Sequence, residues 1–260
     1  MGSIPTRFRQ SSGRTHPRRG RNLCGPPPVP SCPQGGATLP TDDRIAADLR
    51  GFGPLGILAI LVILLAGIVP FLPLSAILVL VWAWRSGTPW HEIGYVRPKS
   101  WTRDLAVGIG FGIVFKFLMK AVVMPLLGAD PINQAFHDLV GNRTALPGAV
   151  YLMIVQAGFG EETFFRGYLF ERFGKLFGSG VWAKTWIVLL TAGWFAQAHY
   201  SLQGLAGVEQ AAITGLVFGT IFAVTGRIWL LIFAHAAFDL TALAIIYWDL
   251  ESNVAHLVFR

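Results

Sequence analysis

The sequence predicts an all-α membrane protein: a polytopic transmembrane bundle of about seven spans, six to eight, behind a disordered N-terminal tail. Two observations predict this fold class. Only 13% of the 260 residues are charged and 53% are hydrophobic, whereas a soluble domain carries about a quarter charged residues. In addition, apolar runs of about 20 residues recur along the chain, which is the length that a helix needs to cross a bilayer.

Residues 1–50 are predicted to form a disordered basic tail rich in Pro, Gly and Arg. Its first 41 residues contain six arginines and no acid, which favours an anionic, cytoplasm-facing membrane surface. We therefore expect an integral plasma (inner) membrane protein with a cytoplasmic N-terminus. Nucleic-acid binding is not expected, because Phe8 is the only aromatic residue there to stack on bases. The tail is either a transit segment or an extension upstream of the true start.

Residues 51–104 are predicted to form an apolar hairpin followed by an interfacial loop. Apolar sequence runs from Pro54 to Trp84, and as a single helix it would measure ~46 Å, longer than the ~30 Å hydrocarbon core. Basic residues follow in 85–104, so the positive-inside rule places that loop in the cytoplasm with the tail. An even number of crossings is then required, which predicts two short spans that are broken near Pro70.

Residues 105–250 are predicted to form the membrane-embedded catalytic core, and residues 251–260 a short C-terminal tail. The first span of this core carries Lys116 and Lys120, one turn apart. Long lysine side chains can snorkel to the interface, which suits Lys120 better than Lys116. A polar loop, residues 128–147, follows. The expected spans of the core are about 105–127, 148–176, 181–200, 207–225 and 228–248.

The strongest chemical signal is a pair of adjacent glutamates, Glu161 and Glu162, inside an apolar segment. Carboxylates there cost several kcal/mol unless they are paired or hydrated. Glu162 and Arg166 share a helical face, which predicts a structural ion pair. Glu161 points about 100° away and has no local partner, so we expect it to be the chemical group. The alternative is that both glutamates lie at a helix end in headgroup water.

Two later spans also carry ionisable residues. His199 ends an apolar span, four residues after Phe195, and alone it would be read as an interfacial residue. His235 and Asp239 are four apart within the last span, and an intramembrane aspartate has few structural explanations. Three helices that each donate such a group, in a chain so poor in charge, favour one convergent site.

These residues resemble the CPBP or ABI family of intramembrane proteases, which includes type II CAAX prenyl endopeptidases and bacteriocin-processing or immunity proteins. The family motifs Glu-Glu-x-x-x-Arg, Phe-x-x-x-His and His-x-x-x-Asn/Asp stand here, in order, at Glu161–Arg166, Phe195–His199 and His235–Asp239. The resemblance covers about residues 80–245. It implies hydrolysis of a peptide bond in a membrane-associated peptide or protein substrate, with a prenylated C-terminus or a leader segment. By motif position, Glu161 and His199 would activate water, while His235 and Asp239 would stabilise the oxyanion or bind metal.

Two versions of the chemistry stay open. In one, zinc or another divalent metal is held by Glu161, His199 and His235 and lowers the pKa of a bound water. In the metal-free version, Glu161 is the general base and His199 orients the water. The metal-free version is favoured because no His-Glu-x-x-His pair preforms a zinc site on one helix. An ionised Asp239 cannot donate a hydrogen bond to an oxyanion as Asn would, so it would orient His235 or ligate a metal instead.

Two other functions use the same residues. They would serve an ion- or proton-coupled transporter as a relay, or belong to a membrane scaffold or immunity protein without proteolysis. The order of the motifs and the pairing of Glu162 with Arg166 favour the protease. One geometric difficulty arises: in straight perpendicular helices, His199 would lie toward the far side of the membrane from Glu161 and His235. The substrate and the oligomeric state are not determined by the sequence.

Overall fold

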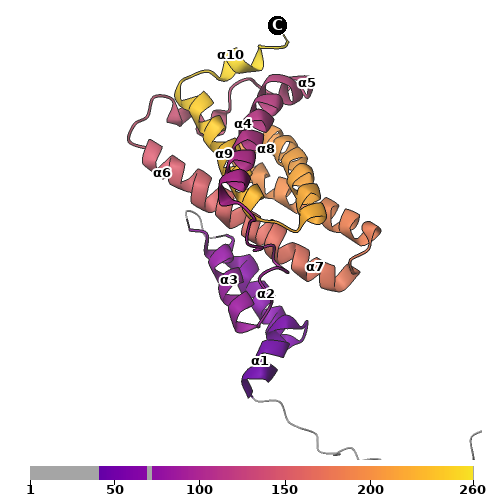
Figure 1. The fold of residues 1–260 in the computed structure, drawn as a ribbon. Helices are drawn as coiled ribbons and strands as arrows, with labels where there is room; N and C mark the ends of the chain where they lie inside the picture. Colours follow the sequence, from indigo (N-terminus) through magenta and orange to yellow (C-terminus); the bar gives the residue numbers. More distant parts are fainter. Residues whose placement is uncertain (1–40, 69–71, 260) are drawn as a thin grey trace, which may run out of the picture. The chain divides into compact units, whose positions relative to one another are not determined.

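The computed structural model describes residues 41–68 and 72–259, and every regular element within these ranges is helical, as predicted. Figure 1 follows the helices from α1 to α10. The interpretation of residues 1–40 as a disordered basic tail lies outside the described residues, as does the predicted break at Pro70.

Three short helices open the described chain: α1 (Thr41–Arg50), α2 (Pro54–Ala66) and α3 (Leu74–Arg85). The prediction that the tail stays disordered to residue 50 is wrong for α1, whose acidic first turn and basic last turn complement the helix dipole. Helices α2 and α3 contact each other, as expected of a hairpin. They have 13 and 12 residues, so each measures ~20 Å and is shorter than the hydrocarbon core.

The long helix α4 (Trp101–Leu118) opens the core and is extended by a π-helical turn, η1 (Met119–Val123), and by α5 (Met124–Leu126). The side chain of Ser100 caps α4 by accepting a hydrogen bond from the Arg103 amide. The following loop contains a short 3₁₀-helix, η2 (Gln134–Leu139). The side chain of Asn133 accepts a hydrogen bond from the Ala135 amide at its start.

A continuous helical segment carries the two glutamates. It consists of α6 (Leu146–Tyr151), η3 (Leu152–Tyr168) and α7 (Leu169–Phe177), and it coincides with the span predicted at about 148–176. The central part, η3, is a π-helix. This form is rare, and where it occurs it frequently marks a functional site.

The next helix, α8 (Val181–Thr225), is folded back on itself at Gly204. This residue has φ 60° and ψ −153°, a conformation that only glycine adopts without strain. The two arms run antiparallel: Lys184 Nζ donates to the Ala223 carbonyl, 2.9 Å away, and Gly215 packs against Ala192. The predicted segments 181–200 and 207–225 are therefore two arms of one helical hairpin.

Helix α9 (Trp229–Tyr247) packs against α4 through glycines. A Cβ added at Gly112 would lie 2.2 Å from the Ala234 carbonyl oxygen, and one at Gly108 would lie 2.8 Å from that of Leu230. Such small residues let two membrane helices approach closely. The C-terminal segment is not merely a tail, because α10 (Glu251–Ala255) buries Glu251 to 2% exposure.

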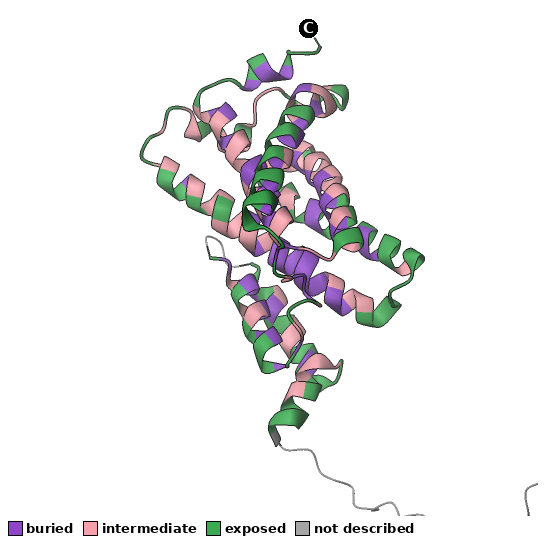
Figure 2. Cartoon of the chain, in the orientation of Figure 1, coloured by how far each residue is buried: buried purple, intermediate pink, exposed green. Residues whose placement is uncertain are grey.

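Three helices of the described chain are long and apolar enough to span a membrane: α4 with η1 and α5, α8, and α9. A fourth span is formed if α1 and α2, bent by 61°, count as one broken span. The predicted count of seven is not confirmed. Large apolar side chains such as Leu58, Val114 and Trp182 are exposed, and Figure 2 shows exposed positions along α2, α4 and α8. These surfaces fit an acyl environment, so the chain is an integral membrane protein.

Candidate active site

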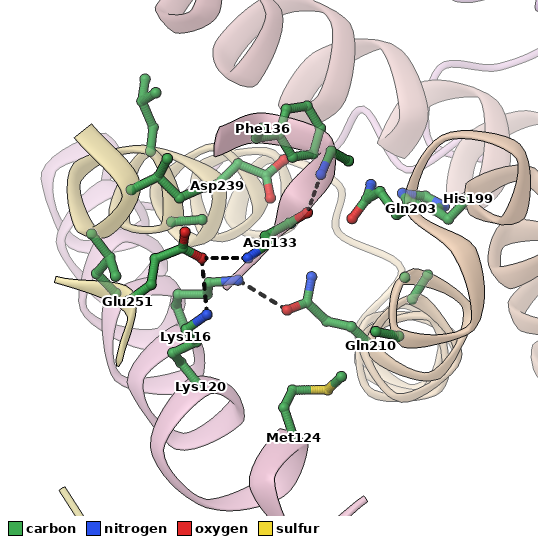
Figure 3. A pocket seen from close by; sticks show the side chains of 18 of the residues that line it. Lys116, Lys120, Met124, Asn133, Phe136, His199, Gln203, Gln210, Asp239 and Glu251 are labelled. Carbon is green, nitrogen blue, oxygen red and sulfur yellow. Dashed lines mark hydrogen bonds and ion pairs between the residues drawn. The ribbon is translucent and has the colours of Figure 1, made fainter. Parts of the chain in front are cut away.

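A cavity of about 500 Å³ lies among the core helices and gathers all four predicted catalytic residues, namely Glu161, His199, His235 and Asp239. They reach it from η3, from the first arm of α8 and from α9. Figure 3 shows the cavity with His199 and Asp239 on its wall. The structure thus brings the three motifs together, although they are spread over almost 80 residues of the chain.

His235 lies at the centre of the polar contacts and is 6% exposed. Its Nδ1 lies 2.6 Å from Glu162 Oε1. Its Nε2 lies 3.7 Å from Glu161 Oε2 and 3.5 Å from Asp239 Oδ2. An Nδ1–H that donates to the Glu162 carboxylate fixes the orientation of the imidazole ring. Nε2 is then left to exchange a proton on the side of Glu161 and Asp239.

The predicted ion pair between Glu162 and Arg166 is present, with Oε1 and Nη1 2.9 Å apart. Both residues are almost fully buried, at 0% and 1% exposure. The Arg166 guanidinium also lies over the rings of Phe195 and Phe218, 4.7 and 5.7 Å from their centroids. The pair therefore joins η3 to α8 by cation–π contacts and to α9 through His235. The sequence did not reveal that second partner of Glu162.

Glu161 has no hydrogen-bond partner at its Oε2, although this atom is buried. Its side chain is 26% exposed and lines the cavity. No hydrogen bond within the described chain occupies this carboxylate, and its partly exposed side chain can bind water or substrate in the cavity. Glu162 differs in that its Oε1 is bound by both Arg166 and His235, which agrees with the different roles that the sequence predicted for the two glutamates.

His199 is oriented by the backbone of its own helix. Its Nδ1 lies 2.8 Å from the Phe195 carbonyl oxygen, and its ring packs edge-on against the Phe195 ring, with centroids 4.6 Å apart. Nδ1–H therefore donates to that carbonyl, and Nε2 remains available. The difficulty raised by straight helices does not arise, because His199 lies five residues before the reversal at Gly204 and shares the cavity with Glu161 and His235.

The sequence offered Glu161, His199 and His235 as ligands of a metal ion. Within residues 41–68 and 72–259, no group of three or more His, Cys, Asp or Glu side chains is arranged to hold a metal ion. The chemistry of Glu161, His199 and His235 would suit zinc, but their arrangement is not a preformed site.

Several polar residues of the cavity were not predicted as site residues. Four glutamine side chains line it, and Lys116 joins them from α4. Gln156 Oε1 is buried without a hydrogen-bond partner. For two of the glutamines the signal was present in the sequence, because Gln156 and Gln210 each interrupt a predicted apolar span. The glutamines are Gln134, Gln156, Gln203 and Gln210.

Residues 143–241 match the family described as Type II CAAX prenyl endopeptidase Rce1-like. The matched segment contains all three motifs, from Glu161 to Asp239, and the resemblance drawn from those motifs is confirmed. Searches of curated proteins and of solved structures found no match.

Proposed function

We propose that this protein, whose residues 143–241 are Rce1-like, is an intramembrane endopeptidase of the CAAX prenyl endopeptidase type. Its substrate would be a membrane-associated peptide or protein. The observation that carries the proposal is the cavity in which Glu161, His199, His235 and Asp239 meet within apolar helices. The basic N-terminal sequence further supports a plasma-membrane location with the N-terminus in the cytoplasm.

Water activation is assigned to Glu161 and His199. The Glu161 side chain is 26% exposed and lines the cavity, and His199 keeps Nε2 available because Nδ1 is held by the Phe195 carbonyl. A water between the two side chains would be oriented by His199 and would give a proton to Glu161. Its oxygen would then bond to the carbonyl carbon of the scissile peptide.

Stabilisation of the tetrahedral intermediate is assigned to His235. Its Nε2–H would donate to the oxyanion, while Glu162, held by Arg166, keeps the ring in place through Nδ1. Asp239 lies 3.5 Å from Nε2 and would help to orient the His235 ring rather than contact the oxyanion, which it would repel. The C–N bond then breaks, and the proton held by Glu161 passes to the leaving nitrogen.

Cleavage by the purified full-length protein tests the proposal. Two substrates are compared, a peptide with a prenylated C-terminus and a leader-type peptide, each with and without a chelator. We expect at least one to be cleaved, with the product ends identified by mass spectrometry, and the chelator to leave the rate unchanged. If the chelator abolished cleavage and added zinc restored it, the metal-free mechanism would be wrong and a zinc-dependent one would take its place. Ion flux in liposomes without any cleavage would instead support a relay in a transporter.

A further inference from the structure

One cationic side chain of the cavity has no role in the proposed hydrolysis. Lys116, on α4, is 7% exposed and lines the cavity. Its Nζ donates to Gln210 Oε1, 2.9 Å away, and lies 4.7 Å from the ring centroid of Phe238. Among the described residues it has no carboxylate within ion-pair distance. A buried ammonium whose partners are an amide oxygen and a ring is an incompletely compensated charge.

Lys120, one turn further along the same face, is a lysine whose charge is compensated by a carboxylate. Its Nζ lies 3.0 Å from Glu251 Oε1 and also donates to the Pro131 carbonyl. The Asn133 amide donates to the same carboxylate oxygen, 3.0 Å away. Figure 3 shows this cluster beside Lys116, whose amine instead points to Gln210. Of the two lysines, only Lys116 retains capacity for an anion.

We propose that Lys116 binds the C-terminal carboxylate of the peptide substrate and thereby determines which bond is presented to Glu161. This inference rests on the proposed function. Lys116 and Glu161 line the same cavity, so a chain anchored at one reaches the other. The ammonium has three donors, and a carboxylate would accept those that Gln210 does not use, in a charge-assisted hydrogen bond.

The end of a chain fits this position better than its middle. An internal stretch of backbone carries no charge, whereas a free C-terminus carries one at its last residue. The cavity wall near Lys116 also contains the cluster of Lys120, Asn133 and Glu251, which ties η1, the loop before η2 and α10 together. This hydrogen-bonded cluster already satisfies Lys120, so the charge left for a chain end in this part of the cavity is that of Lys116.

The test uses two peptides of identical sequence, one with a free C-terminal carboxylate and one with a C-terminal amide. The kcat/KM of each is measured for the wild-type protein and for Lys116→Met and Lys116→Arg. We expect the wild type to prefer the acid by about tenfold or more, as for a hydrogen bond between charged partners. In Lys116→Met the kcat/KM of the acid should fall to that of the amide, and Lys116→Arg should retain a preference.

Lys184→Met is the matched control, because Lys184 is exposed and bonds only the Ala223 carbonyl outside the cavity. It should keep the wild-type preference. Equal cleavage of acid and amide by the wild type, a result that needs no variant to fold, would overturn the inference and leave the proposed hydrolysis standing. An equal loss on both peptides in Lys116→Met would also overturn it. Absence of cleavage of either peptide, and of the prenylated and leader-type substrates, would instead reject the proposed function.

Discussion

Glu161 and Glu162 are neighbours in the chain, yet only Glu162 is held by hydrogen bonds from other side chains. Glu162 is fully buried and shares one carboxylate oxygen between Arg166 and His235. Glu161 presents a carboxylate oxygen without a partner to the cavity. A buried charge is stable only with its partners, whereas an unpaired group beside a cavity is free to react. Substitutions at these two positions should therefore have different consequences.

The first prediction concerns Glu161→Gln. The variant should lose at least about a hundredfold in kcat, since the amide cannot accept the proton of water as a general base does. Its thermal unfolding in detergent should match that of the wild type, because no hydrogen bond to Glu161 Oε2 is lost. Cleavage at the wild-type rate by this variant would remove Glu161 from the mechanism.

The second prediction concerns Arg166→Met. Removal of one partner of a buried ion pair costs about 3–5 kcal/mol, and the variant also loses the contacts of the guanidinium with Phe195 and Phe218. The melting temperature in detergent should fall well below that of Glu161→Gln, which serves as the control. If the two variants melted together, Glu162 would have sufficient compensation from His235 alone, and the ion pair would not be the main support of the site.

At the scale of elements, the site depends on how closely α4 approaches α9. Helix α4 carries Lys116, and α9 carries His235 and Asp239. Their approach is set by Gly108 and Gly112, whose missing side chains leave room for the α9 backbone. In a membrane, where apolar side chains gain little from leaving lipid, such close van der Waals packing drives association.

The third prediction compares two glycines of α4. Gly112→Ala would place a Cβ 2.2 Å from the Ala234 carbonyl oxygen, whereas a Cβ at Gly110 has nothing within 4 Å. Both substitutions gain about 1 kcal/mol of helix propensity, but only Gly112→Ala adds overpacking that costs about 1–3 kcal/mol or more. Thermal unfolding should show Gly112→Ala below Gly110→Ala, with lower cleavage activity as well. Equal melting of the two variants would contradict the close contact.

At the scale of the whole molecule, the main feature is the large number of apolar side chains on the surface of the described residues. The helices that are long and apolar enough to cross a bilayer expose side chains such as Val114, Trp182 and Val224 at 67%, 80% and 79%. A soluble protein rarely exposes large contiguous patches of this kind. In a bilayer the same side chains face acyl chains at no cost.

The fourth prediction is that the full-length protein stays in the membrane fraction after an alkaline carbonate wash and is released only by detergent. Burial of apolar side chains in the hydrocarbon core holds it there, and that interaction is insensitive to pH and salt. Immunoblotting of wash and pellet measures the distribution, with a peripheral membrane protein as control. Recovery in the wash would contradict a spanning arrangement.

Local patterns predicted much of the fold. The apolar runs predicted α4, both arms of α8 and α9 close to their observed bounds, because a membrane helix is defined by its own composition and length. The predicted bounds of helices were wrong at both ends of the described chain, where the composition is polar or short of apolar residues. Residues 41–50 are polar yet helical, and the C-terminal segment forms α10 because Lys120 and the Asn133 amide bind Glu251.

The sequence by itself determined that this is an all-helical membrane protein with ionisable residues within three of its apolar segments. It also determined that Glu162 pairs with Arg166, since residues four apart share a helical face. Only the tertiary structure decided that His235 binds Glu162, 73 residues away, and that Lys116 meets Gln210, 94 residues away. The physical reason is that such contacts depend on how helices pack and where α8 reverses, and no periodicity within one helix encodes its neighbour.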